Sequence, residues 1–237
     1  MTGLLTALCV ILIFGLIILI HELGHFITAK LFGVTVHEFA IGMGPKIFGK
    51  QKGDTFYSVR LIPMGGYVKM EGEDEASESE GAFSKKKPWQ RFIVLFAGAF
   101  MNLLLGLFLL VLSNGINPNL SVLPTMEVAS LQEGMGAEAA GILPGDVITT
   151  VDGSRIHTHL DLNMALQGKE TVSVTVDRMG EDLSFQVPLT VQGGYSYLGI
   201  VRKSQEKNLW NVISYSYFEA FSIVKMTYQS FFGRFTA

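Results

Sequence analysis

The stretch LIILIHELGHFITAK, residues 16–30, places two histidines and a glutamate in an otherwise mostly aliphatic run. A charged side chain at the centre of a bilayer costs about 2.5–3.5 kcal/mol on insertion scales, so such groups are rarely kept there without a partner or a function. Residues 1–20 carry no charged side chain, and about 20 residues suffice for a helix to cross the hydrocarbon core. We therefore expect a first transmembrane helix over residues 1–29, with a functional polar cluster at its end.

The composition also favours a membrane protein. Of the 237 residues, 49% are hydrophobic and only 16% charged, which is too apolar for an ordinary soluble domain. Residues 92–112 hold no ionisable side chain, and we expect a second transmembrane helix over 91–113. The first apolar run lacks a basic leader and a small-residue cleavage site, so it is expected to stay attached. Cys9 is the single cysteine and has no partner for a disulfide.

The distribution of basic residues predicts an orientation. Ten of the 18 Lys and Arg residues lie between 30 and 91, against six between 114 and 208. By the positive-inside rule, residues 30–91 are expected in the cytoplasm and 114–208 outside. The net charge of −3 and the lack of a basic stripe give no indication of nucleic-acid binding.

Residues 30–90 contain strand signals followed by an acidic segment. TFYSVRL (55–61) alternates polar and apolar side chains, Gly65-Gly66 interrupts the run, and YVKM resumes it, which predicts strands joined by a glycine turn. EGEDEASESEG (71–81) has six acidic residues in eleven. Its spacing matches no EF-hand loop, so a solvated linker is favoured over a metal or calcium site.

The second half of the chain predicts a small domain and a further helix. Residues 121–192 contain a Gly-Pro turn, a strand, a short helix and a β-hairpin, TVSVTVDRMGEDLSFQVPL. Residues 207–233 are apolar and aromatic, but polar side chains recur at helical spacing. We expect an amphipathic helix, lying in the membrane interface or packed with its polar face against protein, rather than a lipid-exposed third span.

The polar cluster has the spacing of a metal site. His21 and His25 are four residues apart, so on a helix they lie within about 40° of each other and about 6 Å apart along the axis. Glu22 is turned about 100° away, beside the open position of a metal bound by the histidines. A metal-bound water with a lowered pKa and a neighbouring carboxylate base are the parts of a zinc metalloprotease. The alternative is that the three residues only cap the cytoplasmic end of a spanning helix.

These residues also carry a family resemblance. HELGHFITAKLFGV resembles the zinc signature of site-2 proteases, which cut membrane-embedded helices. EFAIGMGPKIF, YSVRLIPMGGYVKMEGE and FAGAFMNLLLG resemble the successive landmarks of the bacterial regulator of sigma-E protease type, and residues 123–190 resemble its PDZ module. The implied fold is an α+β membrane protein with transmembrane helices, a membrane re-entrant β-hairpin and an inserted extracytoplasmic PDZ-like domain.

The resemblance implies a set of roles. His21 and His25 would bind Zn2+, and Glu22 would be the catalytic base. The edge of the hairpin would hold an unfolded substrate by strand addition, unless it is an ordinary surface hairpin; its residues are Gly65, Gly66, Tyr67, Val68, Lys69 and Met70. The expected partners are the lipid bilayer and single-pass transmembrane substrates, anti-sigma-factor-like or signal-peptide-like. The expected location is the bacterial inner membrane, with the zinc motif near the cytoplasmic side. The groove of the PDZ-like domain could take a peptide end or act as a size filter.

The sequence departs from the family pattern at two points. Gly98 is followed by Ala99 where the family has proline, although Asn102 keeps its place, either hydrogen-bonded near the site or in an interhelical bond. The family's third zinc ligand, an aspartate in a later helix, has no counterpart here.

Five other residues are rejected as metal ligands. Asp152 is expected on the opposite side of the membrane, nothing directs Asp54 or His37 toward the metal, and His157 and His159 are expected to be exposed loop residues.

Two explanations follow from the missing ligand, because catalytic zinc uses three protein ligands and a water. The chain could be the N-terminal portion of a longer protease, or a shortened relative that anchors a PDZ module as a non-catalytic adaptor. The first is favoured, since a chain without catalysis has little reason to retain costly polar groups in the membrane.

Overall fold

The computed structural model describes residues 2–75, 77–117 and 122–232, and the chain divides into two compact units, residues 1–106 and 107–237. The expected α+β class with two apolar helices is confirmed.

Two long helices dominate the first unit. α1 (Thr2–Leu31) and α2 (Pro88–Ile116) extend slightly beyond the predicted ranges 1–29 and 91–113. Among the described helices, only these two have the length and hydropathy of a spanning segment. They approach closely at Gly24, where a Cβ atom would lie 2.5 Å from the carbonyl oxygen of Ala97. Glycine is therefore required at this contact between the helices.

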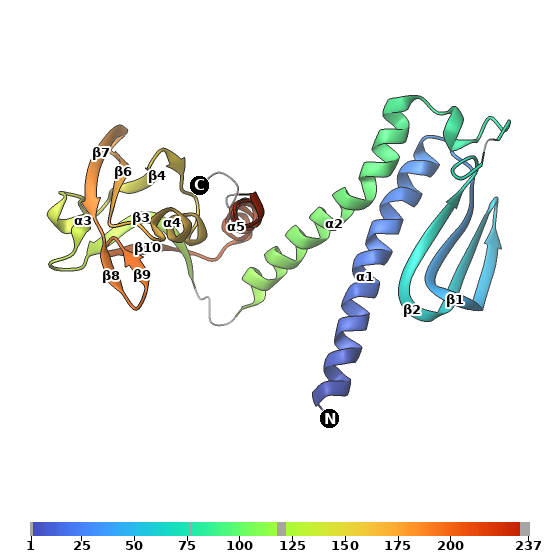
Figure 1. Cartoon of the computed structure of the whole chain (residues 1–237), viewed down its shortest axis with the longest axis horizontal. Coiled ribbons are helices and arrows are strands. Elements are labelled where there is room, and N and C mark those ends of the chain that lie inside the picture. The colour runs from blue at the N-terminus through green and yellow to red at the C-terminus, as the bar shows by residue number, and fades with distance from the viewer. Residues whose placement is uncertain (1, 76, 118–121, 233–237) are drawn as a thin grey trace. The chain divides into compact units, whose positions relative to one another are not determined.

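A sheet formed by two strands lies beside α1 (Figure 1). β1 (Val36–Lys52) and β2 (Thr55–Met70) are antiparallel, and the first half of β1 is paired on both sides: Ala40 is opposite Ser58 on one side and Tyr67 on the other. The chain changes direction near Gly65, whose φ is +89°. Residues 66–70 consequently form an edge, with no described strand on their outer side.

The sheet is anchored to α1 by side chains at its base. Val36, Phe39 and Val68 are buried together with Ala29 of α1 and Val94 of α2. Toward the turns of the sheet the apolar side chains are exposed, among them Ile47, Phe48 and Leu61.

The acidic segment is tied to neighbouring residues at both ends, and at its end the carbonyl oxygen of Gly81 accepts from the backbone amide of Thr35 at 3.0 Å. The Glu71 carboxylate pairs with His37 and accepts from the Ser77 hydroxyl, whereas residues 73–75 and 78–80 are exposed. A short 3-10 helix, η1 (Phe83–Lys85), then leads into α2. The exposed part agrees with the expected solvated linker.

The second unit is built on an antiparallel sheet. Its main strands run in the order β10-β3-β4-β6-β7, and β5 pairs with β4. The bounds are β3 (Val122–Leu131), β4 (Val147–Val151), β5 (Ser154–Arg155), β6 (Thr171–Arg178), β7 (Glu181–Pro188) and β10 (Ile200–Glu206). The expected hairpin is confirmed as β6 and β7. A separate hairpin pairs β8 (Thr190–Gln192) with β9 (Tyr195–Tyr197), and the helices are α3 (Gly136–Ala139) and α4 (His159–Leu166).

The predicted domain range 121–192 leaves out β10. Ile200–Glu206 pairs with β3 at the start of the domain and completes the sheet. This pairing joins residues that are far apart in the sequence, and no local pattern identifies such a partner. The core of the domain is formed mainly by Val and Ile side chains, including Ile148, Val151, Val172, Val174 and Val176.

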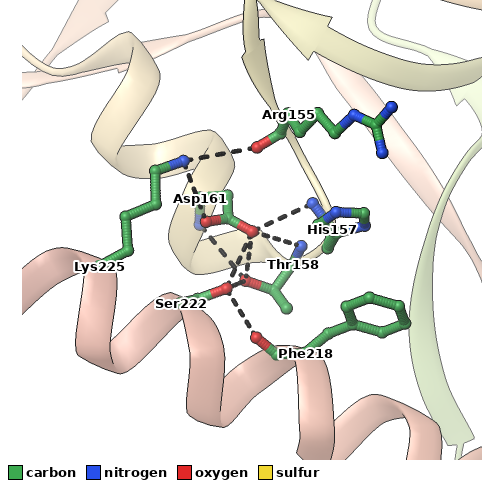
Figure 2. A network of polar contacts seen from close by, with 7 residues as sticks. All are labelled: Arg155, His157, Thr158, Asp161, Phe218, Ser222 and Lys225. Carbon is green, nitrogen blue, oxygen red and sulfur yellow. Dashed lines mark hydrogen bonds and ion pairs between the residues drawn. The ribbon is translucent and has the colours of Figure 1, made fainter.

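The last helix, α5 (Leu209–Phe232), contacts α4 through polar side chains. Thr158 caps α4 in a reciprocal capping box with Asp161. As Figure 2 shows, the hydroxyl of Ser222 donates to Asp161 Oδ2 at 2.9 Å, and Lys225 Nζ lies 3.6 Å from Oδ1. A different face of α5 exposes apolar and aromatic side chains: Trp210, Tyr217, Phe221, Val224 and Tyr228. Among the described side chains of α5, the buried ones are Ser216, Ser222 and the apolar Val212.

Candidate metal centre on the first helix

The two histidines of α1 point their Nε2 atoms toward the same place on α2. A Cβ atom added at Gly98 would lie 2.5 Å from His25 Nε2 and 2.6 Å from His21 Nε2. The two ring centroids are 4.8 Å apart with an interplanar angle of 80°. The absence of a side chain at Gly98 thus leaves space in front of both nitrogens.

The other ring nitrogen of each histidine contacts α2. His25 Nδ1 lies 2.7 Å from the carbonyl oxygen of Val94, which can only accept, so this nitrogen carries the proton. The lone pair of His25 is therefore on Nε2, facing Gly98. This is the tautomer that a metal ligand needs, with the outer nitrogen held by a second partner.

His21 has a side-chain partner instead. Its Nδ1 lies 3.2 Å from Nδ2 of Asn102, while Oδ1 of Asn102 is buried and has no hydrogen-bond partner among the described residues. Leaving such an acceptor unpaired costs about 1–3 kcal/mol. Val94, Gly98 and Asn102 follow one another at intervals of four, so one face of α2 makes all three contacts.

Glu22 lies between the histidines and the edge of the sheet. Its carboxyl interacts electrostatically with both imidazoles and is hydrogen-bonded by the backbone of Val68. A Cβ atom at Gly66 would lie 3.4 Å from Glu22 Cγ. Of the predicted edge residues 65–70, Gly66 and Val68 therefore lie next to the predicted base.

The residues present fit part of a zinc site. Imidazoles are ordinary zinc ligands, and the space that these two share would be filled by any Cβ at Gly98. In the part of the chain that the structure describes, no group of three His, Cys, Asp or Glu side chains could hold a metal ion. The structure thus brings His21, Glu22 and His25 together and adds no third ligand.

The rejected candidates have other partners. Asp152 accepts from Lys169 Nζ at 2.7 Å and from the backbone of Ser173 at 2.8 Å, and the bond from Lys169 lowers the pKa of its carboxyl. His37 pairs with Glu71, and Asp54 is exposed in the turn between β1 and β2.

The two histidines of the second unit are not equivalent. His157 is exposed and stacks on Phe218, with ring centroids 4.5 Å apart. His159 was expected in an exposed loop, but it is half-buried as the first residue of α4. Thr158 before it has the side chain that starts the helix, which explains the difference.

Comparison with known proteins places the chain in a family. Residues 9–237 match the profile of peptidase family M50. The chain belongs to this family. The predicted site-2 protease resemblance is therefore confirmed.

Curated M50-type relatives share this similarity over most of the chain. A protein of Fusobacterium nucleatum is 42% identical over 189 residues, covering 78% of this chain and 56% of its own length. One from Clostridium perfringens is 40% identical over 225 residues, covering 92% and 65%. One from Synechocystis is 31% identical over 244 residues, covering 96% and 66%. Each is named "Putative zinc metalloprotease". The chain spans about half to two thirds of the length of these relatives.

Two solved structures match part of the M50 chain. The PDZ domain of an SdrC-like protein from Listeria innocua has 24% identity and a TM-score of 0.30, covering 35% of this chain and 99% of that domain. The PDZ domain of the SdrC-like protein from Listeria monocytogenes has 21% identity and a TM-score of 0.30, covering 33% and 87%.

One residue of the site was missed from the sequence. Gly98 was noted only for the Ala99 that follows it, yet it makes the space that both histidines face. The available signal was its spacing: a glycine and an asparagine four residues apart in an apolar helix, the same interval that separates His21 from His25. That interval puts Gly98 and Asn102 on one face of α2, level with the two rings.

Proposed function

We propose that this M50 protein is a zinc metalloendopeptidase of the site-2 type, which hydrolyses peptide bonds within transmembrane segments of other membrane proteins. The observation that carries the proposal is the convergence of His21 Nε2 and His25 Nε2 on the space at Gly98, beside a carboxylate and a free strand edge. All of these groups belong to, or contact, a helix apolar enough to cross a membrane.

The roles of the chain's own residues follow from their positions. His21 and His25 would hold Zn2+, which when bound would lower the pKa of a nearby water toward about 7. Glu22 accepts the proton of the attacking water and later transfers it to the leaving amine. The described residues supply two ligands, whereas a catalytic zinc site uses three.

The edge strand supplies a way to hold many substrates. No described strand pairs with the outer side of residues 66–70, and an extended substrate segment can pair there through its own backbone. Because backbone bonds do not depend on side chains, such an edge accepts different sequences. It would place the substrate backbone beside Glu22, which contacts Val68.

The setting of the reaction follows from the charge distribution. Residues 30–91 hold ten of the 18 basic side chains, which supports a cytoplasmic position for the zinc motif and an extracytoplasmic position for the PDZ-like domain. We place the protein in the bacterial inner membrane, acting on single-pass substrates that are anti-sigma-factor-like or signal-peptide-like. The exposed apolar turns of the β1–β2 sheet support its entry into the membrane.

The test is Glu22→Gln in the full-length protein, with a single-pass substrate in the same membranes. We expect cleavage to fall at least about 100-fold, as for loss of a general base, while the zinc content by elemental analysis is unchanged. Glu78→Gln, which alters an exposed carboxylate of the acidic segment, is the matched control and should cleave normally. Full activity of Glu22→Gln would contradict the proposal.

The alternative is a non-catalytic, membrane-anchored PDZ adaptor that lacks the third zinc ligand. One observation favours it: a groove of about 200 Å³ between α4 and the segment leading into β10, lined by Leu162, Leu166, Leu198 and Ile200 among others. An adaptor would be indifferent to Glu22→Gln, whereas narrowing the groove with Leu162→Trp would abolish its binding of partner peptides.

A further inference from the structure

Asn102 is the residue of α2 that contacts His21, and its present contact is incompatible with metal binding at that ring. Nδ2 of Asn102 lies 3.2 Å from His21 Nδ1, and an amide NH2 group can only donate. The ring nitrogen would then be an acceptor, so a neutral His21 would carry its proton on Nε2. That nitrogen, which faces Gly98, could offer no lone pair to a metal.

The other end of the Asn102 amide also lacks a favourable contact. Its Oδ1 is buried and has no partner among the described residues. Rotation of the amide by 180° exchanges the two ends at almost no change in shape. It brings Oδ1 to His21 Nδ1, so that the ring donates from Nδ1, the buried acceptor is satisfied and the lone pair moves to Nε2.

We propose that Asn102 is a positioning residue for the metal: its amide oxygen accepts from His21 Nδ1 and so fixes the tautomer that binds through Nε2. The inference rests on the proposed zinc site and assigns a role to a residue outside the ligand set. With this bond, the Nδ1 atom of each histidine donates to an oxygen of α2, since the carbonyl oxygen of Val94 already accepts from His25 Nδ1.

The arrangement explains why a neutral side chain occupies this position. A carboxylate would accept equally well, but it would bring a charge into an apolar helix, where charges are costly. An apolar residue would leave Nδ1 of His21 without an acceptor. An amide supplies the acceptor with no charge, and its position one turn after Gly98 puts it level with the His21 ring.

The experiment measures zinc affinity by chelator competition on the full-length protein in detergent. Asn102→Leu removes the acceptor, and we expect zinc to bind about 10–100-fold more weakly, the usual effect of losing an outer partner. Asn102→Asp keeps an acceptor at the same place and should stay within about threefold of the unaltered protein, which is less than the loss expected for Asn102→Leu. Asn114→Leu is the control, because Asn114 lies on the same helix but donates to Ser216 and Glu219.

A purely structural role predicts a different pattern. If Asn102 only joined the helices, Asn102→Leu would alter the unfolding midpoint without altering zinc affinity, and that result would overturn the inference. An equal loss of affinity in Asn102→Asp and Asn102→Leu would also overturn it, since the acceptor would then be irrelevant.

Replacing a ligand distinguishes this inference from the proposed function. If His25→Ala removes zinc but Asn102→Leu does not, only the role of Asn102 is wrong. If His25→Ala leaves zinc affinity unchanged, the metal site itself is absent, and the inference falls with the proposed function. A cobalt-substituted protein provides a second readout, because the absorption bands of the metal shift when the orientation of the His21 ring changes.

Discussion

The two units each contain a polar cluster in apolar surroundings, and the clusters differ in how completely they are satisfied. In the second unit, the Asp161 carboxylate accepts from the backbone amides of His157 and Thr158 and from the Ser222 hydroxyl, and it pairs with Lys225 (Figure 2). In the first, the Nε2 atoms of His21 and His25 have no hydrogen-bond partner in the described part of the chain.

This difference distinguishes a cluster that supports the fold from one that has a chemical role. Buried polar groups are almost always paired, so a closed cluster such as that of Asp161 is explained by the packing of α4 against α5. An open cluster on a helix that is apolar enough to cross a membrane has no such explanation from packing, and that points to a ligand or a reaction. The predictions below test whether metal binding needs the free space in front of His21 and His25, and whether stability needs the hydrogen bonds of Asp161.

Filling the space at Gly98, in front of the two histidines, should have the largest effect on zinc affinity. In Gly98→Ala, the new methyl group would lie 2.5 and 2.6 Å from the two Nε2 atoms, and these are contacts that real structures do not contain. One of the rings must move, so we expect zinc affinity to fall by more than the roughly 100-fold that marks the upper end for an outer partner. Chelator competition on the full-length protein measures this loss.

The same helix offers a matched control. Gly106 lies two turns further along α2, and a Cβ atom there would have nothing within 4 Å. Gly106→Ala should bind zinc normally and stabilise the helix slightly, because alanine has the higher helix propensity. Normal zinc binding in Gly98→Ala would show that the space at Gly98 is not the metal position.

The part of the site that could be predicted from the sequence is the part set by local helix geometry. His21, Glu22 and His25 all belong to α1, and the period of 3.6 residues fixes their relative directions. Gly98 and Val94 belong to another helix, and no local pattern states which face of α2 meets α1. Their contribution needs the close approach of the helices at Gly24.

The fold shows the same division between local and distant information. The strand pattern at 55–61 and the glycine break at Gly65-Gly66 predicted strands joined by a turn, whereas the edge at residues 65–70 was implied by the family resemblance. The double pairing of β1 and the return of β10 to β3 were not predicted, because both join strands through backbone bonds. Backbone pairing leaves little trace in side-chain type when one face of the strand is exposed.

Removing a hydrogen bond from the Asp161 cluster should have a smaller effect, and it should alter stability rather than metal binding. Ser222→Ala removes one donor from the buried Asp161 carboxylate, and we expect a loss of about 1.5–3 kcal/mol, as for hydrogen bonds to charged groups. Denaturant unfolding in detergent measures the change. Zinc affinity should be unaffected.

A second serine of α5 provides the comparison. Ser222 and Ser230 both donate to a carbonyl oxygen four residues earlier, but only Ser222 also reaches Asp161. Ser230→Ala should therefore change stability by no more than about 0.5 kcal/mol. If the two variants were equally stable, the bond to Asp161 would contribute nothing, and the closed cluster would not be what joins α5 to α4.

The smallest effect concerns a second closed site, Asp146, whose carboxylate accepts from Arg178 Nε at 2.7 Å and from the backbone amide of Leu143 at 2.8 Å. The Arg178 bond lowers the pKa of the Asp146 carboxyl below its ordinary value of 3.8. Near that pH the unfolded chain binds more protons than the folded one, so stability rises with pH. The stabilisation is complete above that ordinary value and is lost as the pH falls through it toward the lower pKa of the folded state.

Asp146→Asn should reduce this slope without abolishing it, because the pKa values of Asp152 and Asp161 are also lowered in the fold. One proton accounts for at most about 1.4 kcal/mol per pH unit, which sets the upper limit of the change. Unfolding midpoints measured between about pH 5 and pH 3 give the slope, since this window brackets the ordinary aspartate value. An unchanged slope in Asp146→Asn would mean that the ion pair with Arg178 persists in the unfolded chain. The pairing of Asp146 with Arg178 would then not depend on the fold.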